Sequence, residues 1–112
     1  MQKNNKDLSC DLCPVARATS VIGDKWNVLI IRNLIYVQTS CRFDDFLTQL
    51  AIARNILSCR LDYLLEQGII EKKQYEEKPP RYVYQLTEKG VALTPILEQM
   101  AIWSEKWLKI QN

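Results

Sequence analysis

The spacing of apolar and polar residues predicts a series of helices, then a two-stranded hairpin and a last helix. Pro14 and Gly23 suit the start and the stop of a first helix. Asp24 suits the N-cap of a second helix that runs from residue 25 to about residue 36. Because apolar residues cover nearly the whole circumference of this second helix, we expect it to be the central element of the core.

Two shorter amphipathic helices come next. The first has apolar residues at positions i, i+3, i+4 and i+7, namely Phe43, Phe46, Leu47 and Leu50. After a break at about residues 51 and 52, a helix over residues 54–67 places Leu57 and Leu61 toward the core and ends before Gly68. Two such helices joined by a few residues are typical of a helix-turn-helix unit.

The stretch EKKQYEEKPPRYVYQLTEKG, residues 71–90, predicts a charged hairpin. Tyr82, Tyr84 and Leu86 share one face at strand period, and residues 69–74 are the expected partner strand. Residues 75–80 between them are polar and restricted by prolines, so we expect them to form the tip. Since an isolated hairpin is barely stable in water, it must pack against the helices.

A final helix is expected over residues 88–110, with an early kink at Pro95. Six of its apolar residues alternate between spacings of three and four, as in the seam of a coiled coil: Leu93, Ile96, Met100, Trp103, Trp107 and Ile110. A small domain has little core left to bury them, which favours pairing with a second copy of the chain. The alternative is that this helix folds back onto the first helix of its own chain.

The fold class that follows is mainly α with a small β-hairpin, a winged helix-turn-helix with additional N- and C-terminal dimerisation helices. The division of the chain would be an N-terminal arm (residues 1–12), a DNA-binding domain (13–86) and a dimerisation helix (87–112).

Composition narrows the class of protein further. The 112 residues suit one domain, and 47% apolar with 25% charged residues is a globular balance. A net charge of +2 permits nucleic-acid binding without arguing for it. No apolar run approaches the ~18 to 20 residues of a membrane span and no signal peptide is evident, so we expect a cytoplasmic protein with reduced thiols. Without histidine, a glycine-rich phosphate loop or a nucleophile paired with a base, an enzyme is not expected.

Four segments carry a resemblance to a known family: CPVARATSVIGDKWNVLIIRNL, RFDDFLTQL, ILSCRLDYLLEQGIIEK and PPRYVYQLTEKG. They resemble the HxlR family of winged-helix transcriptional regulators, small bacterial relatives of the MarR-type regulators. The resemblance implies a DNA-binding homodimer whose N- and C-terminal helices make the dimer contact, with the hairpin as a wing against the DNA backbone. One departure is Ala53, where family members often carry serine or threonine at the N-cap of the recognition helix. Its missing hydroxyl costs ~1 kcal/mol of helix stability and affects the target sequence more than the activity.

A recognition helix places its N-terminal residues nearest the bases. With Leu57 and Leu61 toward the core, the outward residues are Arg54, Asn55, Ser58 and Cys59. Arg54 could bind guanine and Asn55 adenine, and the alternative is that both are ordinary solvated residues. Arg42, Lys78 and Arg81 are candidate phosphate contacts, while Arg60 either binds a phosphate or braces the fold.

The cysteines suggest a sensor more than a metal site. Cys10 and Cys13 form a single C-x-x-C, so neither a four-thiolate zinc site with Cys41 and Cys59 nor a thioredoxin-type role is favoured, and no metal or cofactor is expected. Cys13 precedes Pro14 at a helix N-terminus, a position that favours a reactive thiol. By resemblance, Cys13 is the candidate sensor of oxidants, quinones or aldehydes, resolved by Cys10 or by a cysteine of the other subunit. The alternative is a thiol packed at the dimer contact, and Cys41 and Cys59 are expected to be ordinary small residues.

The function expected from these patterns is sequence-specific regulation of transcription, with repression as the favoured sign. A homodimer would bind a pseudo-palindromic double-stranded operator, and an oxidant acting at Cys13 or a small apolar molecule would be the inducer. One alternative is a winged-helix module that binds protein instead of DNA, which would show no salt-dependent DNA affinity. Another is a ligand-responsive regulator without thiol sensing.

Overall fold

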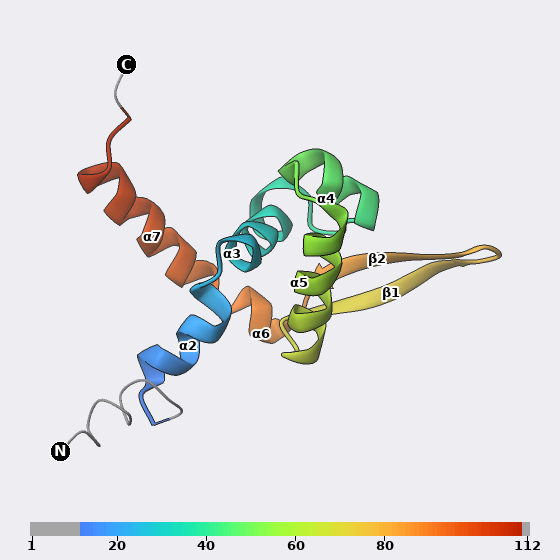
Figure 1. Cartoon of the computed structure of the whole chain (residues 1–112), viewed down its shortest axis with the longest axis horizontal. Helices are drawn as coiled ribbons and strands as arrows, with labels where there is room; N and C mark the ends of the chain where they lie inside the picture. The colour runs from blue at the N-terminus through green and yellow to red at the C-terminus, as the bar shows by residue number, and fades with distance from the viewer. Residues whose placement is uncertain (1–11, 111–112) are drawn as a thin grey trace.

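The computed structural model describes residues 12–110, as a helical body from which two helices and a hairpin project (Figure 1). The elements in chain order are α2 (Pro14–Ile22), α3 (Lys25–Arg32), the π-helix η1 (Asn33–Val37), α4 (Phe43–Leu50), α5 (Arg54–Glu66), β1 (Ile70–Glu77), β2 (Pro80–Leu86), α6 (Glu88–Val91) and α7 (Thr94–Trp107). The predicted mainly helical fold with a small hairpin is confirmed. None of the helices in the described range is long and apolar enough to cross a membrane.

The first two helices begin and end where their capping residues predict. Pro14 opens α2, and the backbone N–H of Gly23 closes it by donating to the Thr19 carbonyl. The Asp24 side chain accepts a hydrogen bond from the backbone N–H of Asn27 at 3.0 Å, which caps the start of α3. The predicted second helix continues to about residue 36, but its last turns widen into the π-helix η1.

The core lies between α3, η1, the helix-turn-helix and the base of the hairpin. It comprises Ile30, Ile31, Leu34, Cys41, Phe46, Ile52, Leu57, Leu61, Leu64, Ile69, Ile70, Tyr84 and Leu97. The expectation that α3 is the central element is confirmed, because Ile30 and Ile31 are fully buried and Leu34 of η1 nearly so. Fully burying an aliphatic side chain contributes about 1.5 to 3 kcal/mol, so these contacts fix the helices that carry the site.

The turn between α4 and α5 lies where the sequence predicts it. Ala51 ends α4 in the left-handed region, at φ 52° and ψ 42°, which is costly for a residue with a Cβ. Ala53 then stands at the N-cap of α5 and offers no side-chain hydrogen bond. Gly68 follows the end of α5 with a φ of 71°, the left-handed conformation for which glycine is suited.

The hairpin is longer than predicted. Strands β1 and β2 pair antiparallel from Ile70 opposite Leu86 out to Glu77 opposite Pro80, so most of the expected tip lies within the strands. Proline is tolerated there because Pro80 is the first residue of an exposed strand. The base of the hairpin is anchored by Cys41, whose backbone N–H and carbonyl pair with Tyr84 at 3.1 and 2.7 Å.

The C-terminal part corrects the prediction of one kinked helix over residues 88–110. It forms two helices, because Thr87 caps the short α6 through Gly90 and Pro95 lies in the first turn of α7. Proline is favoured at that position, since the first turn has no N–H partner to lose. Helix α7 ends at Trp107, so Leu93 precedes it and Ile110 follows it. The predicted seam is therefore helical only in its middle.

The molecule is extended for its length. Its radius of gyration is 16.4 Å, whereas a compact domain of this size has about 13 Å. Figure 1 shows the reason: α2 and α7 project on one side of the body and the hairpin on the other. The α7 projection exposes apolar side chains that a compact domain would bury.

Candidate nucleic-acid interface

Helix α5 has the two-sided character required of a recognition helix. Leu57 and Leu61 are buried, and Arg54, Asn55 and Ser58 are exposed in the first turns. The core contacts therefore fix the rotation of α5 about its axis, and with it the direction in which the exposed side chains point.

Arg54 is oriented by the preceding helix. Its guanidinium Nη2 lies 3.6 Å from the Asp44 Oδ1, and the same group stands 5.6 Å from the centre of the Phe43 ring. Both partners of the ion pair are more than 70% exposed, at 72% and 74%. An exposed pair adds little stability, so its main effect is to restrict where Arg54 points.

Arg42 stands at the start of α4, where it forms a bidentate arrangement with Asp45. The backbone N–H of Arg42 donates to Asp45 at 2.9 Å, and its Nη2 lies 3.0 Å from the Asp45 Oδ1. The Arg42 side chain lowers the pKa of Asp45, and the same contact raises the pKa of Arg42. The guanidinium is thus held at the N-terminal end of α4 with its side chain 53% exposed.

The hairpin carries the other two candidate cations, Arg81 and Lys78. Arg81 Nε forms an ion pair with Glu76 Oε1 at 2.8 Å across the two strands. Lys78 lies in the turn and is exposed, without a carboxylate within ion-pair distance in the described part of the chain. Nearer the body, the Lys72 ammonium lies 4.4 Å from the centre of the Tyr82 ring. The hairpin therefore carries four cations against three carboxylates, Glu71, Glu76 and Glu77, so its excess of positive charge is small.

The sequence leaves two roles open for Arg60, phosphate binding and bracing of the fold. The structure shows a bracing contact. Its Nε donates to both carboxylate oxygens of Asp24 at 3.1 Å, which joins the middle of α5 to the start of α3. The hydrogen bond from Arg60 is the largest cause of the lowered pKa of Asp24, and it raises the pKa of Arg60 in return.

A network of polar side chains behind α4 is not predicted from the sequence. Buried Asn33 of η1 donates to the Gln49 Oε1 at 2.7 Å, Gln49 donates to the Gln38 Oε1 at 2.8 Å, and Gln38 donates to the Asp45 Oδ2 at 3.0 Å. These pairs are 7 to 16 residues apart in the chain and follow no spacing rule. Only the unusual position of an asparagine inside an apolar helix hinted at a buried partner. The network fixes α4 relative to the core.

The described cysteines are free and lie in different surroundings. Cys13 is half-buried at the N-cap of α2, Cys41 is buried and Cys59 is exposed. Burial raises the pKa of the Cys41 thiol to about 11, which makes it unreactive near neutral pH. Cys10 lies outside the described residues. Within residues 12–110, no three acidic, histidine or cysteine side chains gather as a metal site would require.

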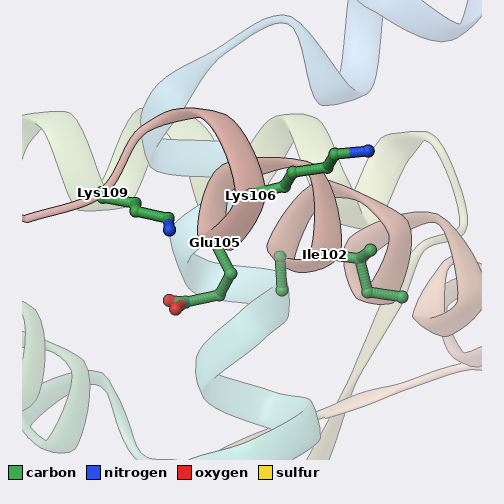
Figure 2. A pocket seen from close by; sticks show the side chains of 5 residues that line it. Ile102, Glu105, Lys106 and Lys109 are labelled. Atoms are coloured by element: carbon green, nitrogen blue, oxygen red, sulfur yellow. The ribbon is translucent and has the colours of Figure 1, made fainter.

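Helix α7 exposes much of the predicted seam. Leu93 is half-buried, and the exposed members are Ile96, Met100, Trp103, Trp107 and Ile110. An apolar groove of about 770 Å³ lies between α3, η1 and α7, lined by Val28, Leu29, Tyr36 and Met100 among others. Another side of α7, together with the residues that follow it, is mixed in character: Figure 2 shows Ile102 beside the charged side chains of Glu105, Lys106 and Lys109.

A helix-turn-helix followed by a hairpin, with basic residues on the exposed side of α5 and along the hairpin, defines a winged-helix protein of the DNA-binding class. A family model described as HxlR-like helix-turn-helix matches residues 21–112. The chain therefore belongs to the HxlR-like family of helix-turn-helix transcriptional regulators, which bind DNA and are not enzymes.

Individual relatives agree with this assignment. The chain is 33% identical over 96 residues to the HTH-type transcriptional regulator YdeP of Bacillus subtilis, covering 85% of this chain and 73% of YdeP. The reduced form of the transcriptional regulator YodB from B. subtilis superimposes with a TM-score of 0.76 at 31% identity, over 91% of this chain and 100% of that chain. The redox regulator HypR in its oxidised form gives a TM-score of 0.73 at 34% identity, over 84% and 96% of the two chains.

Proposed function

We propose that this transcriptional regulator binds a specific double-stranded operator as a homodimer and represses transcription from it in the cytoplasm. The observation that carries the proposal is the exposure of Arg54, Asn55 and Ser58 in the first turns of α5, opposite a buried leucine side. In this binding mode such residues read base edges in the major groove, while the hairpin contacts the backbone.

The contacts divide into base reading and phosphate binding. Arg54 would take the two acceptors of a guanine and Asn55 the acceptor and donor of an adenine, with Ser58 one turn further along α5. Arg42, Lys78 and Arg81 would bind phosphates. The ion pair with Asp24 favours bracing over phosphate binding as the role of Arg60.

The exposed apolar residues of α7 favour the dimer. Trp103 and Trp107 are 56% and 63% exposed, which is a large unfavourable area for a monomer in water. Pairing of α7 with a second copy would cover them and place two copies of α5 on successive turns of the operator.

Thiol sensing by Cys13 is the proposed trigger. It is half-buried at the start of α2, and the related HypR is described as a redox regulator in its oxidised form. A second candidate trigger is a small apolar ligand in the groove between α3, η1 and α7, favoured by the apolar lining of that groove.

The test is a titration of labelled duplexes selected from genomic fragments, including the region upstream of the gene, at two salt concentrations. Arg54→Ala should lose discrimination at one guanine by roughly 5- to 150-fold, the equivalent of about 1 to 3 kcal/mol. Lys78→Ala should weaken binding to all sequences alike. It should also reduce the slope of the logarithm of affinity against the logarithm of salt concentration by about one. Lys109→Ala, which removes a cation just after the end of α7, is the matched control and should change neither.

An oxidant arm of the same titration tests Cys13: diamide should release the wild type from its operator and leave Cys13→Ser bound. Negligible, salt-independent binding to every duplex would contradict the DNA-binding proposal and favour a module that binds protein.

A further inference from the structure

One edge of the Arg42 guanidinium is occupied by Asp45, and the other edge carries no carboxylate. The Arg42 Nε lies 3.3 Å from the Asp45 Oδ2, and its Nη2 lies 3.0 Å from the Oδ1. Gln38 donates to the same carboxylate at 3.0 Å, so Asp45 is fixed from a second side. Within residues 12–110, no other carboxylate lies within ion-pair distance of Arg42. The edge formed by Nη1 and Nη2 therefore keeps parallel N–H donors, the arrangement that suits the oxygens of a phosphate.

A β-bulge in the hairpin sets the direction of Tyr75. Gln74 pairs with Tyr82 and Glu76 pairs with Arg81, so Tyr75 is an extra residue without a partner on β2. The Gln74 side chain donates to the Glu76 carbonyl at 2.9 Å and thereby spans the bulge. Bulges bend a strand and re-aim a side chain, and they are frequent beside functional sites. Tyr75 is 47% exposed, so a ligand can reach it from solvent.

Tyr75 and the Arg42 guanidinium lie close together, although they belong to different parts of the fold. The backbone of Cys41 pairs with that of Tyr84 at 3.1 and 2.7 Å, which places the start of α4 beside the hairpin. The pKa of Arg42 is raised chiefly by Asp45, and the Tyr75 hydroxyl raises it further, which places this hydroxyl near the guanidinium. The helix-turn-helix and the hairpin thus present hydrogen-bond donors to the same exposed space.

The charges around this space favour a phosphate that belongs to DNA over a free anion. Asp45 already balances the charge of Arg42, and Glu76 beside Tyr75 is balanced by Arg81 at 2.8 Å. A free anion would therefore gain little from net attraction. A backbone phosphate is brought to the space when α5 and the hairpin engage the same duplex, and a linked contact of this kind acts at a high effective concentration. Its unesterified oxygens can accept from a guanidinium edge and from a hydroxyl together.

We propose that Arg42 and Tyr75 bind one phosphate of the DNA backbone together, so that the helix-turn-helix and the hairpin hold the same point of the duplex. Arg42 donates from its free edge, and the Tyr75 hydroxyl donates to one of the same oxygens. Tyr75 is thereby a DNA-contacting residue without a charge, which is why the pattern of basic residues does not indicate it. This inference rests on the proposed function and assigns one shared contact within it.

Tyr75→Phe tests the contact, because it removes the hydroxyl and keeps the ring. In titrations of the selected duplex it should weaken binding about 3- to 10-fold, the effect of one hydrogen bond. The slope of the logarithm of affinity against the logarithm of salt concentration should not change, because tyrosine is neutral. Tyr82→Phe, which removes another exposed hydroxyl from the hairpin, is the matched control and should bind as the wild type does.

A double-mutant cycle tests whether the two residues act together. Arg42→Met should weaken binding and reduce the salt slope by about one. It keeps the backbone N–H that donates to Asp45, so the start of α4 should stay folded, as circular dichroism can check. In the Arg42→Met background, Tyr75→Phe should change affinity by less than about twofold, because the phosphate is no longer held between the two side chains.

Duplexes with a single methylphosphonate, which lacks the charged oxygen, locate the phosphate. At one position in each half-site the wild type should bind more weakly, and there neither Tyr75→Phe nor Arg42→Met should weaken binding further. Different positions for the two variants, equal losses from Tyr75→Phe in both backgrounds, or full affinity of Tyr75→Phe would overturn this proposal and leave the proposed function standing. A wild type that bound no duplex would overturn both.

Discussion

At the scale of single residues, the arginines of the candidate DNA surface share one feature: each lies beside a carboxylate. Arg42, Arg54 and Arg81 stand 3.0, 3.6 and 2.8 Å from Asp45, Asp44 and Glu76. The pairs of Arg54 and Arg81 are exposed and contribute about 0 to 1 kcal/mol, so a phosphate can replace those carboxylates at small cost. Asp45 is only 16% exposed and stays with Arg42. The carboxylates therefore serve to direct the guanidinium groups, and they keep the net charge at only +2.

The N-cap of α5 yields a prediction about stability. Ala53 leaves the first N–H groups of this helix without a side-chain acceptor, so Ala53→Ser should raise the free energy of unfolding by about 1 kcal/mol. That gain corresponds to a melting temperature about 4 to 8 °C higher for a domain of this size, measurable by circular dichroism. Ala101→Ser, at an exposed position inside α7, is the matched control and should not stabilise the protein. Equal effects at both positions would mean that the hydroxyl does not cap α5.

Residues with a local structural role were predictable, whereas those with distant partners were not. Asp24 and Gly68 act within one turn of helix, so capping rules placed them correctly. Ala51 adopts a left-handed conformation that its identity does not favour, because the core contacts on either side of the turn fix its backbone. The chain from Asn33 through Gln49 to Gln38 depends on η1 lying against α4, which no local pattern encodes.

At the scale of elements, the Asp24–Arg60 pair connects the start of α3 with the middle of α5. Asp24 caps α3 and accepts from Arg60 with the same carboxylate, so its two roles can be separated by substitution. Asp24→Asn keeps an acceptor for the cap and loses the charge. Asp24→Ala loses both the acceptor and the charge. It should lower the free energy of unfolding by about 1 kcal/mol more than Asp24→Asn, because the cap is missing. Urea denaturation of the two variants at neutral pH measures the difference.

The pH dependence of stability checks the ionic part of this contact. The pKa of Asp24 is lowered from its ordinary value in the folded protein, chiefly because Arg60 donates to the carboxylate. A carboxyl group with a lowered pKa contributes stability above its unfolded pKa, and the contribution is lost as the pH falls through the folded pKa. The wild type should therefore exceed Asp24→Asn in stability at neutral pH, and the difference should shrink below about pH 4. A difference that stays constant down to pH 2 would contradict the ionic role.

Element types followed from periodicity, but their ends depended on tertiary contacts. The spacing of Phe43 to Leu50 predicted α4 with its bounds. Pro95 is compatible both with a kink in one helix and with the first turn of a new helix. The cap at Thr87 and the burial of Leu97 favour the new helix. The strands ran beyond the expected tip because an exposed two-stranded ribbon accepts polar residues and an edge proline.

At the scale of the whole molecule, the projections on opposite sides of the body imply separate roles. The hairpin and α7 project in different directions (Figure 1). The hairpin carries charged residues, whereas α7 exposes tryptophan and methionine. A charged projection can remain in water, but an apolar one requires a cover. A single sequence indicates this apolar excess through its heptad spacing, but it does not show which surface covers these side chains, because the same spacing suits a second copy and a helix of the same chain.

Trp103→Glu tests whether a second copy is that cover. Trp103 is 56% exposed, so the charge should leave the fold of the single chain intact and oppose burial between two copies of α7. We expect sedimentation of the wild type at twice its 13.1 kDa and of the variant at 13.1 kDa. Operator affinity of the variant should fall about 10²- to 10⁴-fold, because the two copies of α5 no longer bind as a unit. Lys109→Gln, which also lowers the charge by one but lies just after α7 in the mixed region, should stay dimeric. A wild type that sediments as a monomer, or a Trp103→Glu variant that unfolds instead of dissociating, would favour α7 packing within its own chain.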